Sequence, residues 1–397
     1  MPVIADSVLI RHLAPKNFLS FGPDNAGIEL QALNLFIGPN GSGKSNLIEA
    51  ISLMRSAPKT LRDVTRKGGG VAEWIWKGNA RDSASVEMSV RFPEGAVTLR
   101  HLIEFRAESQ ALSVVRERVQ SSKGRGKKSD LKQWYEYTKG SRPLIQKKDK
   151  PVKTRVAIAA FEENNSILAQ RRDPETYPQL AWLAANYENI RIYREWSFGR
   201  NAASRKPQQA DMRSDRLEED LSNLGLFLNR LKSRSPAAKK AILAGLKDLY
   251  AGISDFDVSV DGGTVQVFFT EGDFVIPATR LSDGTLRYLC LLAILCDPEP
   301  PPLICIEEPE LGLHPDILPG LADLLKEASE RTQLIVTTHS DILVDAMTET
   351  PECVVVCEKH EGKTEMTRLS GSELKVWLEK YRLGELWIRG HLGGKRW

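Results

Sequence analysis

Residues 33–46 read Leu33-Asn34-Leu35-Phe36-Ile37-Gly38-Pro39-Asn40-Gly41-Ser42-Gly43-Lys44-Ser45-Asn46. The first five residues predict a buried strand, and after the glycine-rich turn apolar side chains recur at helical spacing, at Leu47, Ile48, Ala50, Ile51 and Met54. Residues 38–45 match the phosphate-binding loop at every fixed position. Because the match lies between a strand and a helix, the pattern favours a phosphate site over an ordinary structural turn.

Each residue type in this loop has a physical role. Glycines let backbone N–H groups turn inward around phosphates, and the following helix N-terminus adds a favourable dipole. We expect Lys44 to reach the β- and γ-phosphates of ATP and the Ser45 hydroxyl to ligate Mg²⁺. The predicted ATP-binding residues are Gly38, Pro39, Asn40, Gly41, Ser42, Gly43, Lys44, Ser45 and Asn46.

Two later apolar runs end in polar side chains suited to the same chemistry. Leu303–Ile306 is followed by Glu307 and Glu308, and the run 334–337 is followed by Thr338 and His339. Ligands bind at the carboxyl ends of strands in open α/β sheets. We therefore expect Glu307 to hold Mg²⁺, Glu308 to orient or deprotonate the attacking water, and His339 to contact the γ-phosphate. The competing interpretations are a solvated acidic loop for the two glutamates, which a preceding phosphate-binding loop disfavours, and a structural histidine, which is the commoner role of a histidine taken alone.

Leu281-Ser282-Asp283-Gly284-Thr285 opens a further apolar helix over 286–295. A serine, a backbone glycine and a helix N-terminus together form a candidate second anion site. An ordinary capped turn is the competing interpretation. The position of this segment before the Glu307–Glu308 pair and His339 favours the anion site.

The remaining sequence indicates an α/β fold with an insertion. Residues 1–60 and 217–397 alternate strand-like and helix-like stretches, which predicts a mostly parallel sheet flanked by helices. Residues 61–216 carry alternating strands at 86–92, 96–105 and 112–119, followed by helical patterns at 155–171 and 175–187, and form the predicted inserted α+β region. Helices are also expected at 217–231, 236–250 and 315–331.

The composition excludes several classes of protein. Hydrophobic residues make up 41% and charged residues 27%, which excludes a wholly disordered chain, and the net charge of +3 limits any nucleic-acid affinity to a local patch. The longest apolar stretch, 288–296, is too short to span a membrane. Five cysteines in apolar surroundings indicate a reduced, cytoplasmic protein, and a packed core explains them better than a metal site.

One such basic patch is residues 121–155, hereafter the basic segment. It contains twelve Lys or Arg residues against Asp130, Glu136 and Asp149, a local net charge of +9. Trp134, Tyr135 and Tyr137 are interleaved, and cations with aromatic faces suit a nucleic-acid backbone and unstacked bases. A solvated loop or hairpin is the competing interpretation.

Taken together, these motifs resemble the ABC-type ATPase head of the SMC and RecF group. More narrowly, the chain is similar to compact RecF-like predicted ATPases, the AAA domains of the AbiEii or OLD-like sort. The resemblance covers about the first 60 and last 180 residues and is carried by Asn17-Phe18, GPNGSGKSN, LSDGTLR, EEPELGLHP, TTHSD, and the closing Leu383–Trp387 and Gly393-Gly394. The signature reads LSDGT where the family pattern is LSGGQ, and Leu19 stands where many relatives have Arg.

The resemblance implies an ATP-dependent homodimer in which ATP lies between the phosphate-binding loop of one copy and the signature of the other. Ser282, Asp283 and Gly284 would then act in trans, and residues 310–314 would cross between subunits, although a helix-start turn explains residues 310–314 equally well. No long heptad run lies between Ser45 and Ser282, which excludes a coiled-coil arm.

Two functions remain open at this point. One is an ATP-driven clamp acting on DNA, in repair or in defence against phage. The other is an ATP-gated regulatory subunit that controls a separately encoded nuclease or toxin, since no acidic cluster of a fused nuclease is found. A transporter motor fits poorly because residues 46–281 leave room for an insertion that such a motor does not need.

Overall fold

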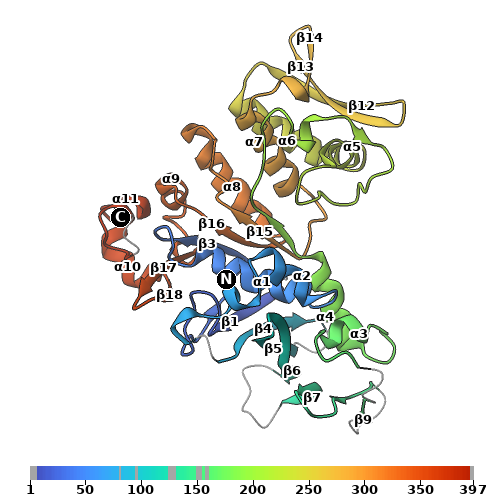
Figure 1. The fold of residues 1–397 in the computed structure, drawn as a ribbon. Coiled ribbons are helices and arrows are strands. Elements are labelled where there is room, and N and C mark those ends of the chain that lie inside the picture. Colours follow the sequence, from blue (N-terminus) through green and yellow to red (C-terminus); the bar gives the residue numbers. More distant parts are fainter. Residues whose placement is uncertain are drawn as a thin grey trace.

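The computed structural model describes residues 7–79, 82–93, 97–123, 131–148, 154–156 and 161–393, which form three sheets with helices packed between and around them (Figure 1). The predicted fold class is confirmed: a mostly parallel sheet flanked by helices, with a further α+β region. No helix in this described part of the chain is long and apolar enough to cross a membrane.

The central sheet has six strands in the order β10-β15-β16-β3-β17-β18. The first five run parallel, and β18 is antiparallel to β17. The carboxyl ends of the five parallel strands therefore meet at one edge. The bounds are β3 (Leu33–Ile37), β10 (Arg191–Tyr193), β15 (Leu303–Glu307), β16 (Gln333–Thr337), β17 (Val354–His360) and β18 (Lys363–Arg368).

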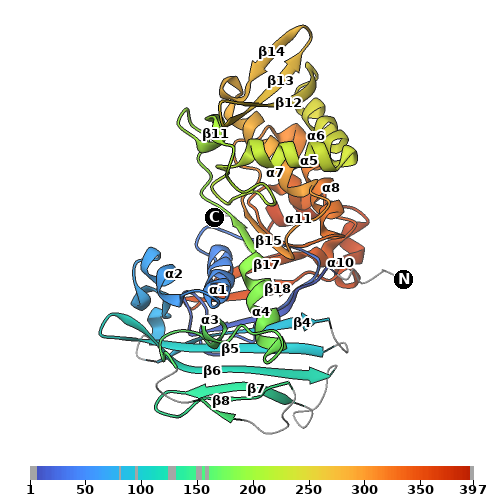
Figure 2. The same cartoon turned by 90° about the vertical axis from the view of Figure 1, so that its right-hand side faces the viewer.

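A second, eight-stranded sheet has the order β2-β1-β4-β5-β6-β7-β8-β9 and is antiparallel throughout. It lies at the end of the molecule opposite the third sheet, described below, with α1 (Lys44–Ser56) between it and the central sheet (Figure 2). Its strands are β1 (Ile10–Lys16), β2 (Ile28–Glu29), β4 (Ala84–Phe92), β5 (Val97–Glu108), β6 (Ala111–Lys123), β7 (Lys132–Thr138), β8 (Leu144–Ile145) and β9 (Thr154–Arg155).

Alternation along the central strands divides the interior into two cores. On β3, Phe36 joins one core while Leu35 and Ile37 join the other, and on β15 Cys305 and Ile304 are divided in the same way. The first core packs against the eight-stranded sheet and α1 (Lys44–Ser56), α2 (Leu61–Lys67), α3 (Ile167–Gln170) and α4 (Pro178–Asn189). The second packs against α8 (Leu318–Ser329), α9 (Asp341–Asp345) and α11 (Leu383–Ile388), with α10 (Gly371–Leu378) at its margin.

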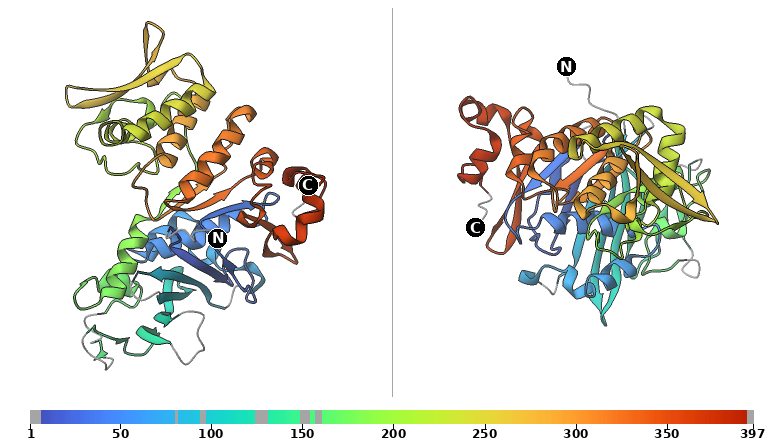
Figure 3. Two further views of the ribbon diagram at one scale, coloured as in Figure 1. Left: turned by 180° about the vertical axis from the view of Figure 1, so that it is seen from behind. Right: turned by 90° about the horizontal axis from the view of Figure 1, so that it is seen from above.

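The third sheet belongs to an upper lobe that lies at the opposite end of the molecule from the eight-stranded sheet (Figure 3). In it, β13 pairs with β11, β12 and β14. Its elements are α5 (Leu224–Arg234), α6 (Pro236–Leu249), α7 (Asp283–Leu295), β11 (Gln208–Gln209), β12 (Ile253–Asp261), β13 (Thr264–Glu271) and β14 (Phe274–Pro277).

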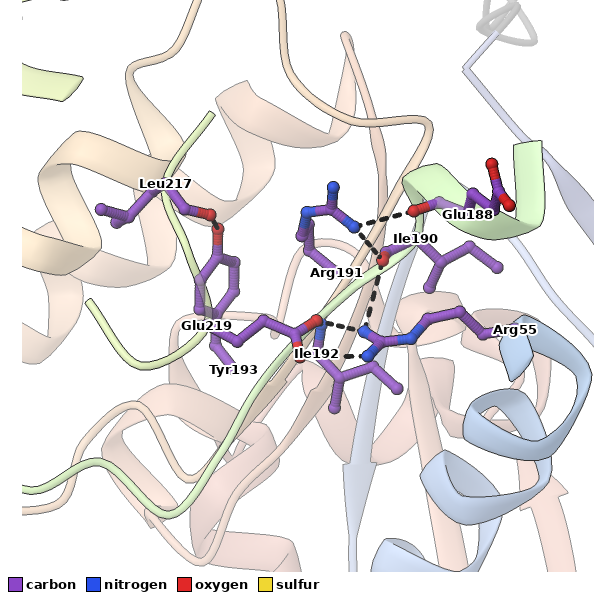
Figure 4. A network of polar contacts seen from close by, with 8 residues as sticks. All are labelled: Arg55, Glu188, Ile190, Arg191, Ile192, Tyr193, Leu217 and Glu219. Atoms are coloured by element: carbon purple, nitrogen blue, oxygen red, sulfur yellow. Dashed lines mark hydrogen bonds and ion pairs between the residues drawn. The ribbon is translucent and has the colours of Figure 1, made fainter. Parts of the chain in front are cut away.

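A polar network fastens the chain that leads into the upper lobe to α1 and the central sheet (Figure 4). Arg55 at the end of α1 forms a two-pronged contact with Glu219, and the Ile192 N–H of β10 also donates to that carboxylate. The Tyr193 hydroxyl donates to the Leu217 carbonyl at 3.0 Å. The two lobes are therefore connected by directed bonds rather than by packing alone.

The structure differs from several predicted boundaries. Strand β10 lies in the central sheet although it falls within 61–216, and β1 lies in the sheet formed mainly by that region, so the division at residues 60 and 216 cuts across both sheets. The helix expected at 217–231 begins only at Leu224, because the fully buried Asn223 side chain ties the preceding loop through the Arg213 and Arg216 carbonyls.

The expected helix at 155–171 is wrong for its described residues, where only α3 is helical; residues 157–160 lie outside the described part. The helix at 236–250 is confirmed, and that at 315–331 is a short 3₁₀ turn followed by α8.

The basic segment is a set of strands over its described residues, which supports the hairpin rather than the loop. Its residues 124–130 and 149–153 lie outside the described part. The three aromatic residues are buried: Trp134 is 9% exposed, Tyr135 0% and Tyr137 1%. Lys132 already lies over the Trp134 ring, 4.0 Å from its centroid. The expectation that these rings stack on unpaired bases is therefore wrong, since they face the core.

Candidate nucleotide site

The phosphate-binding loop joins β3 to α1 in a conformation that only glycines allow. Gly38, Gly41 and Gly43 have φ angles of +144°, +75° and +101°. A Cβ on Gly38 would lie 2.2 Å from the Cys357 carbonyl oxygen, and one on Gly43 would lie 2.1 Å from the Thr364 hydroxyl. The loop therefore needs glycine here for backbone conformation and for space.

Lys44 is 6% exposed and folds over this loop. Its ammonium donates to the Gly38 carbonyl at 2.8 Å and to the Pro39 carbonyl at 3.1 Å. Burial lowers the pKa of Lys44, while the nearby carboxylates of Glu308, Glu310 and Glu307 act to raise it. The cation is thus held on exchangeable carbonyl partners, ready to transfer to phosphate oxygens.

Ser45 and Glu307 lie together at the start of α1 and the end of β15. Their hydrogen bond acts to lower the Glu307 pKa, but burial is the larger influence and raises it. One Glu307 oxygen, Oε1, is buried without a hydrogen-bond partner. A hydroxyl and a carboxylate with one unpartnered buried oxygen are oxygen donors of the kind that Mg²⁺ prefers, so these two residues fit the predicted metal role.

Glu308 and His339 face each other across the ends of β15 and β16. The Nε2 atom of His339 lies 3.5 Å from the Glu308 carboxylate. Glu308 adopts the left-handed backbone conformation, with φ +46°, and its N–H donates to the Thr337 carbonyl at 3.0 Å. That turn directs the acid out of the strand, where a water molecule could reach it.

Glu310 is a site residue whose role the sequence did not reveal. Its Oε1 atom accepts from the Thr338 hydroxyl and from the His339 N–H, both at 2.7 Å, and its Oε2 atom is buried without a partner. Burial raises the Glu310 pKa. It holds the strand end that carries His339. Sequence placed it only in a segment crossing to the partner or in a helix-start turn.

Residues distant in the sequence hold the phosphate-binding loop and α1 in place. The Thr364 hydroxyl on β18 contacts the Ser42 carbonyl at 2.8 Å and the Ser20 hydroxyl at 2.6 Å, and the Asn46 amide donates to Ser20 at 2.8 Å. At the end of β10, Arg194 pairs with Glu49 at 2.5 Å. No local motif marks these residues, because they act through long-range pairing.

The signature segment, Ser282 to Gly284, lies apart from this cluster at the start of α7. The Ser282 hydroxyl caps the helix by accepting from the Thr285 N–H at 3.1 Å. Gly284 lies close to the loop after β15: a Cβ there would be 2.8 Å from the Gly312 carbonyl oxygen. Among the described residues, no hydrogen bond or ion pair joins this segment to the phosphate-binding loop of the same chain.

The structure thus brings Lys44, Ser45, Glu307, Glu308 and His339 to one edge of the central sheet, as the sequence predicted. Asn40 and Gly41 are exposed at the rim of the loop, while Ser42 and Gly43 are buried beneath it. Ser282 and Asp283 are exposed at the start of α7, and Gly284 is half-buried.

Comparisons with known proteins agree with this fold. Residues 33–345 match the protein-family model described as "AAA domain, putative AbiEii toxin, Type IV TA system". Among solved structures, an Smc head bound to the C-terminal winged-helix domain of ScpA is similar, with 16% identity, a TM-score of 0.56, and coverage of 93% of this chain and 100% of that one. An Smc head with an extended coiled coil, bound to the C-terminal domain of ScpA from Pyrococcus furiosus, has 16% identity, a TM-score of 0.53, and coverage of 94% and 99%. No curated protein matches.

Proposed function

The chain belongs to the family described as AAA domain, putative AbiEii toxin, type IV toxin–antitoxin system, and from that membership we propose that it binds and hydrolyses ATP as a head-to-tail homodimer. The observation that carries the proposal is the convergence of Lys44, Ser45, Glu307, Glu308 and His339 at one sheet edge. Mg²⁺ would be held by Ser45 and Glu307, and would neutralise charge on the β- and γ-phosphates.

The protein's own residues divide the work. Lys44 exchanges its two carbonyl partners for phosphate oxygens, and the loop N–H groups bind the remaining oxygens. Glu308 orients the attacking water and accepts its proton, while the bond from the γ-phosphorus to the β–γ bridging oxygen breaks and ADP leaves. His339, fixed by Glu310, supplies a donor toward the γ-phosphate.

The second copy completes the site in this proposal. Ser282 and Gly284 offer a hydroxyl and a backbone N–H at a helix N-terminus, which stabilise phosphate charge without adding negative charge of their own. Their separation from the phosphate-binding loop of their own chain supports action in trans.

The test uses Glu308→Gln, which keeps the size of the side chain but removes the base. We expect turnover to fall about a thousandfold or more, ATP binding to remain, and ATP to shift the protein to dimers in sedimentation velocity. Glu299→Gln, an exposed acid of the opposite sheet edge, is the matched control. A Glu308→Gln protein that stays monomeric with saturating ATP would contradict the sandwich.

DNA is the proposed target of this switch. The supporting observation is the +9 charge of the basic segment, whose described cations Lys132, Arg142, Lys148 and Arg155 are exposed. Since the aromatic rings are buried, binding would rest on phosphate contacts alone, and affinity should fall by about 0.9 log units per contact for each tenfold rise in salt.

The sharper experiment replaces only those four exposed cations by Gln and leaves the buried rings in place. We expect the salt slope for duplex DNA to become shallower by up to about 3.6 log units if all four contact phosphates. Replacing Lys77, Lys240, Lys375 and Lys380 instead is the control. An unchanged slope would remove this segment from DNA binding.

A regulatory role is the second candidate, and one structural feature favours it. Val376, Trp377 and Ile388 expose apolar surface on α10 and α11, at 72%, 45% and 46%. Two structurally similar Smc heads were solved bound to a domain of a separate protein, ScpA. Purification from cells with and without ATP, followed by mass spectrometry, tests for a stoichiometric nuclease or toxin partner that is lost when Trp377 is changed to Ser.

A further inference from the structure

The signature turn carries a carboxylate at the position nearest the helix N-terminus. Asp283 is the first residue of α7, and its side chain is 64% exposed. The first turn of a helix stabilises an acid, so the monomer tolerates Asp283 well. A γ-phosphate approaching Ser282 and Gly284 from a second copy would, however, meet this negative charge.

A buried arginine compensates for the charge. Arg205, which is 6% exposed, contacts the Asp283 carboxylate through its Nη2 atom. Its other donors bond the Leu281 carbonyl at 2.7 Å and the Phe198 carbonyl at 2.9 Å. One guanidinium therefore fixes both the backbone that enters the signature turn and the acid within it.

A second cation near Asp283 in the sequence is directed elsewhere. Arg287 stands one turn after Asp283 on α7, where an i, i+4 pair is normally possible. Its guanidinium instead donates to the Leu311 carbonyl and lies 5.3 Å from the ring centroids of both Trp196 and Phe198. Among the ion pairs of the described residues, Asp283 is joined to Arg205.

We propose that Arg205 is a positioning residue for the signature segment, which neutralises Asp283 and so permits the triphosphate bound to a second copy of this chain to dock on Ser282 and Gly284. This inference rests on the proposed head-to-tail dimer. Removing Arg205 leaves an uncompensated carboxylate facing a polyanion, and like charges placed across an interface cost several kcal/mol.

A purely structural role for Arg205 makes a different prediction. If the arginine only holds the Leu281 and Phe198 carbonyls, then loss of those bonds weakens the dimer whatever residue stands at 283. If neutralisation matters, removing the Asp283 charge as well restores docking. The double variant therefore separates the two roles.

The experiment measures the dimer dissociation constant by sedimentation in saturating ATP, with Glu308→Gln as the parent so that hydrolysis does not deplete the dimer. Arg205→Met is expected to weaken the dimer at least about tenfold, and Asp283→Asn added to it should return the constant to within about threefold of the parent. The Arg205→Met defect should also shrink at high salt, because screening weakens the repulsion.

Arg205→Lys is the control for a folding defect in Arg205→Met. It keeps a charge beside Asp283 but loses the forked bonds to two carbonyls, and it should dimerise within about threefold of the parent. Failure of Asp283→Asn to rescue folded Arg205→Met overturns the inference and leaves the dimer proposal intact. Failure of the parent itself to dimerise with ATP overturns both.

Discussion

The phosphate-binding edge and the signature turn contrast sharply, although both would hold the same triphosphate. At the edge, Lys44 is nearly buried and Glu307, Glu308 and Glu310 all act on its pKa. At the turn, Ser282 and Asp283 are exposed, and Arg205 supplies the buried support. In the proposed dimer, the phosphate-binding edge would hold the nucleotide of its own chain. The signature turn would contact the nucleotide bound to the partner.

Because of this difference, we expect variants at the phosphate-binding edge and variants at the signature turn to lose different activities. Loss of Lys44 or of a loop glycine at the edge should weaken nucleotide binding strongly in the chain that carries the change. Damage at the turn should leave binding intact and stop turnover in the partner's site. Variants that do not separate in this way would remove the basis for action in trans.

The largest expected effect comes from pairing Lys44→Ala with Ser282→Arg. Each alone should lose nearly all ATPase activity, but only Lys44→Ala should lose ATP affinity, by about a hundredfold or more because a buried charge–phosphate contact is removed. Mixed in equal amounts, they should recover about a quarter of wild-type activity, since half the dimers would carry one intact site of two.

Lys44→Ala mixed with wild-type protein is the control for exchange of subunits, and nucleotide titration of each variant checks affinity separately. No recovery in the mixture, despite exchange shown by sedimentation, would place Ser282 outside the partner's site.

Glycine substitutions give the next largest effect. Gly43→Ala places a Cβ against Thr364 at a positive φ, so we expect a loss of about 2 kcal/mol or more in the free energy of unfolding together with weak ATP binding. Gly284→Ala places its Cβ 2.8 Å from the Gly312 carbonyl in a helical residue, so the loss of stability should be smaller and ATP affinity unchanged. Chemical denaturation and nucleotide titration measure both. Equal losses of stability and of ATP affinity in Gly43→Ala and Gly284→Ala would contradict the contrast between the phosphate-binding edge and the signature turn.

The sequence was informative where chemistry is local. The loop from Gly38 to Asn46 and the acids after β15 could be read because strand, turn and helix follow one another without a break. Parallel strand ends meet at one edge, so His339 could be placed beside Glu308 from topology alone.

Contacts between residues far apart in the sequence could not be predicted in this way. Thr364 reaches Ser42 across more than three hundred residues, and Arg205 reaches Asp283 from a short 3₁₀ turn, Ala203–Arg205, that no sequence motif marks. The burial of Trp134, Tyr135 and Tyr137 was also missed, because basic neighbours suggested exposure while sheet pairing determined which way the rings face.

Glu310→Gln has the smallest expected effect, a change in thermal stability. It tests whether the buried Glu310 carboxylate destabilises the phosphate-binding edge when it ionises. Because burial raises the Glu310 pKa, the folded state binds the proton more tightly than the unfolded chain does. The contribution of Glu310 to stability is therefore greatest below its usual pKa and is lost as the pH rises through the raised value.

Once the pH has risen through the raised pKa, Glu310 no longer contributes this stability, whereas a glutamine does not titrate and keeps an oxygen for Thr338 and the His339 N–H. We expect Glu310→Gln to raise Tm by a few degrees, about 2–4 °C, at pH 7.5 and by almost nothing at pH 4. The exposed Glu365→Gln on β18 is the control. Calorimetry over this pH range decides the matter: a shift equally large at pH 4 would mean that packing, not an ionised buried acid, accounts for it.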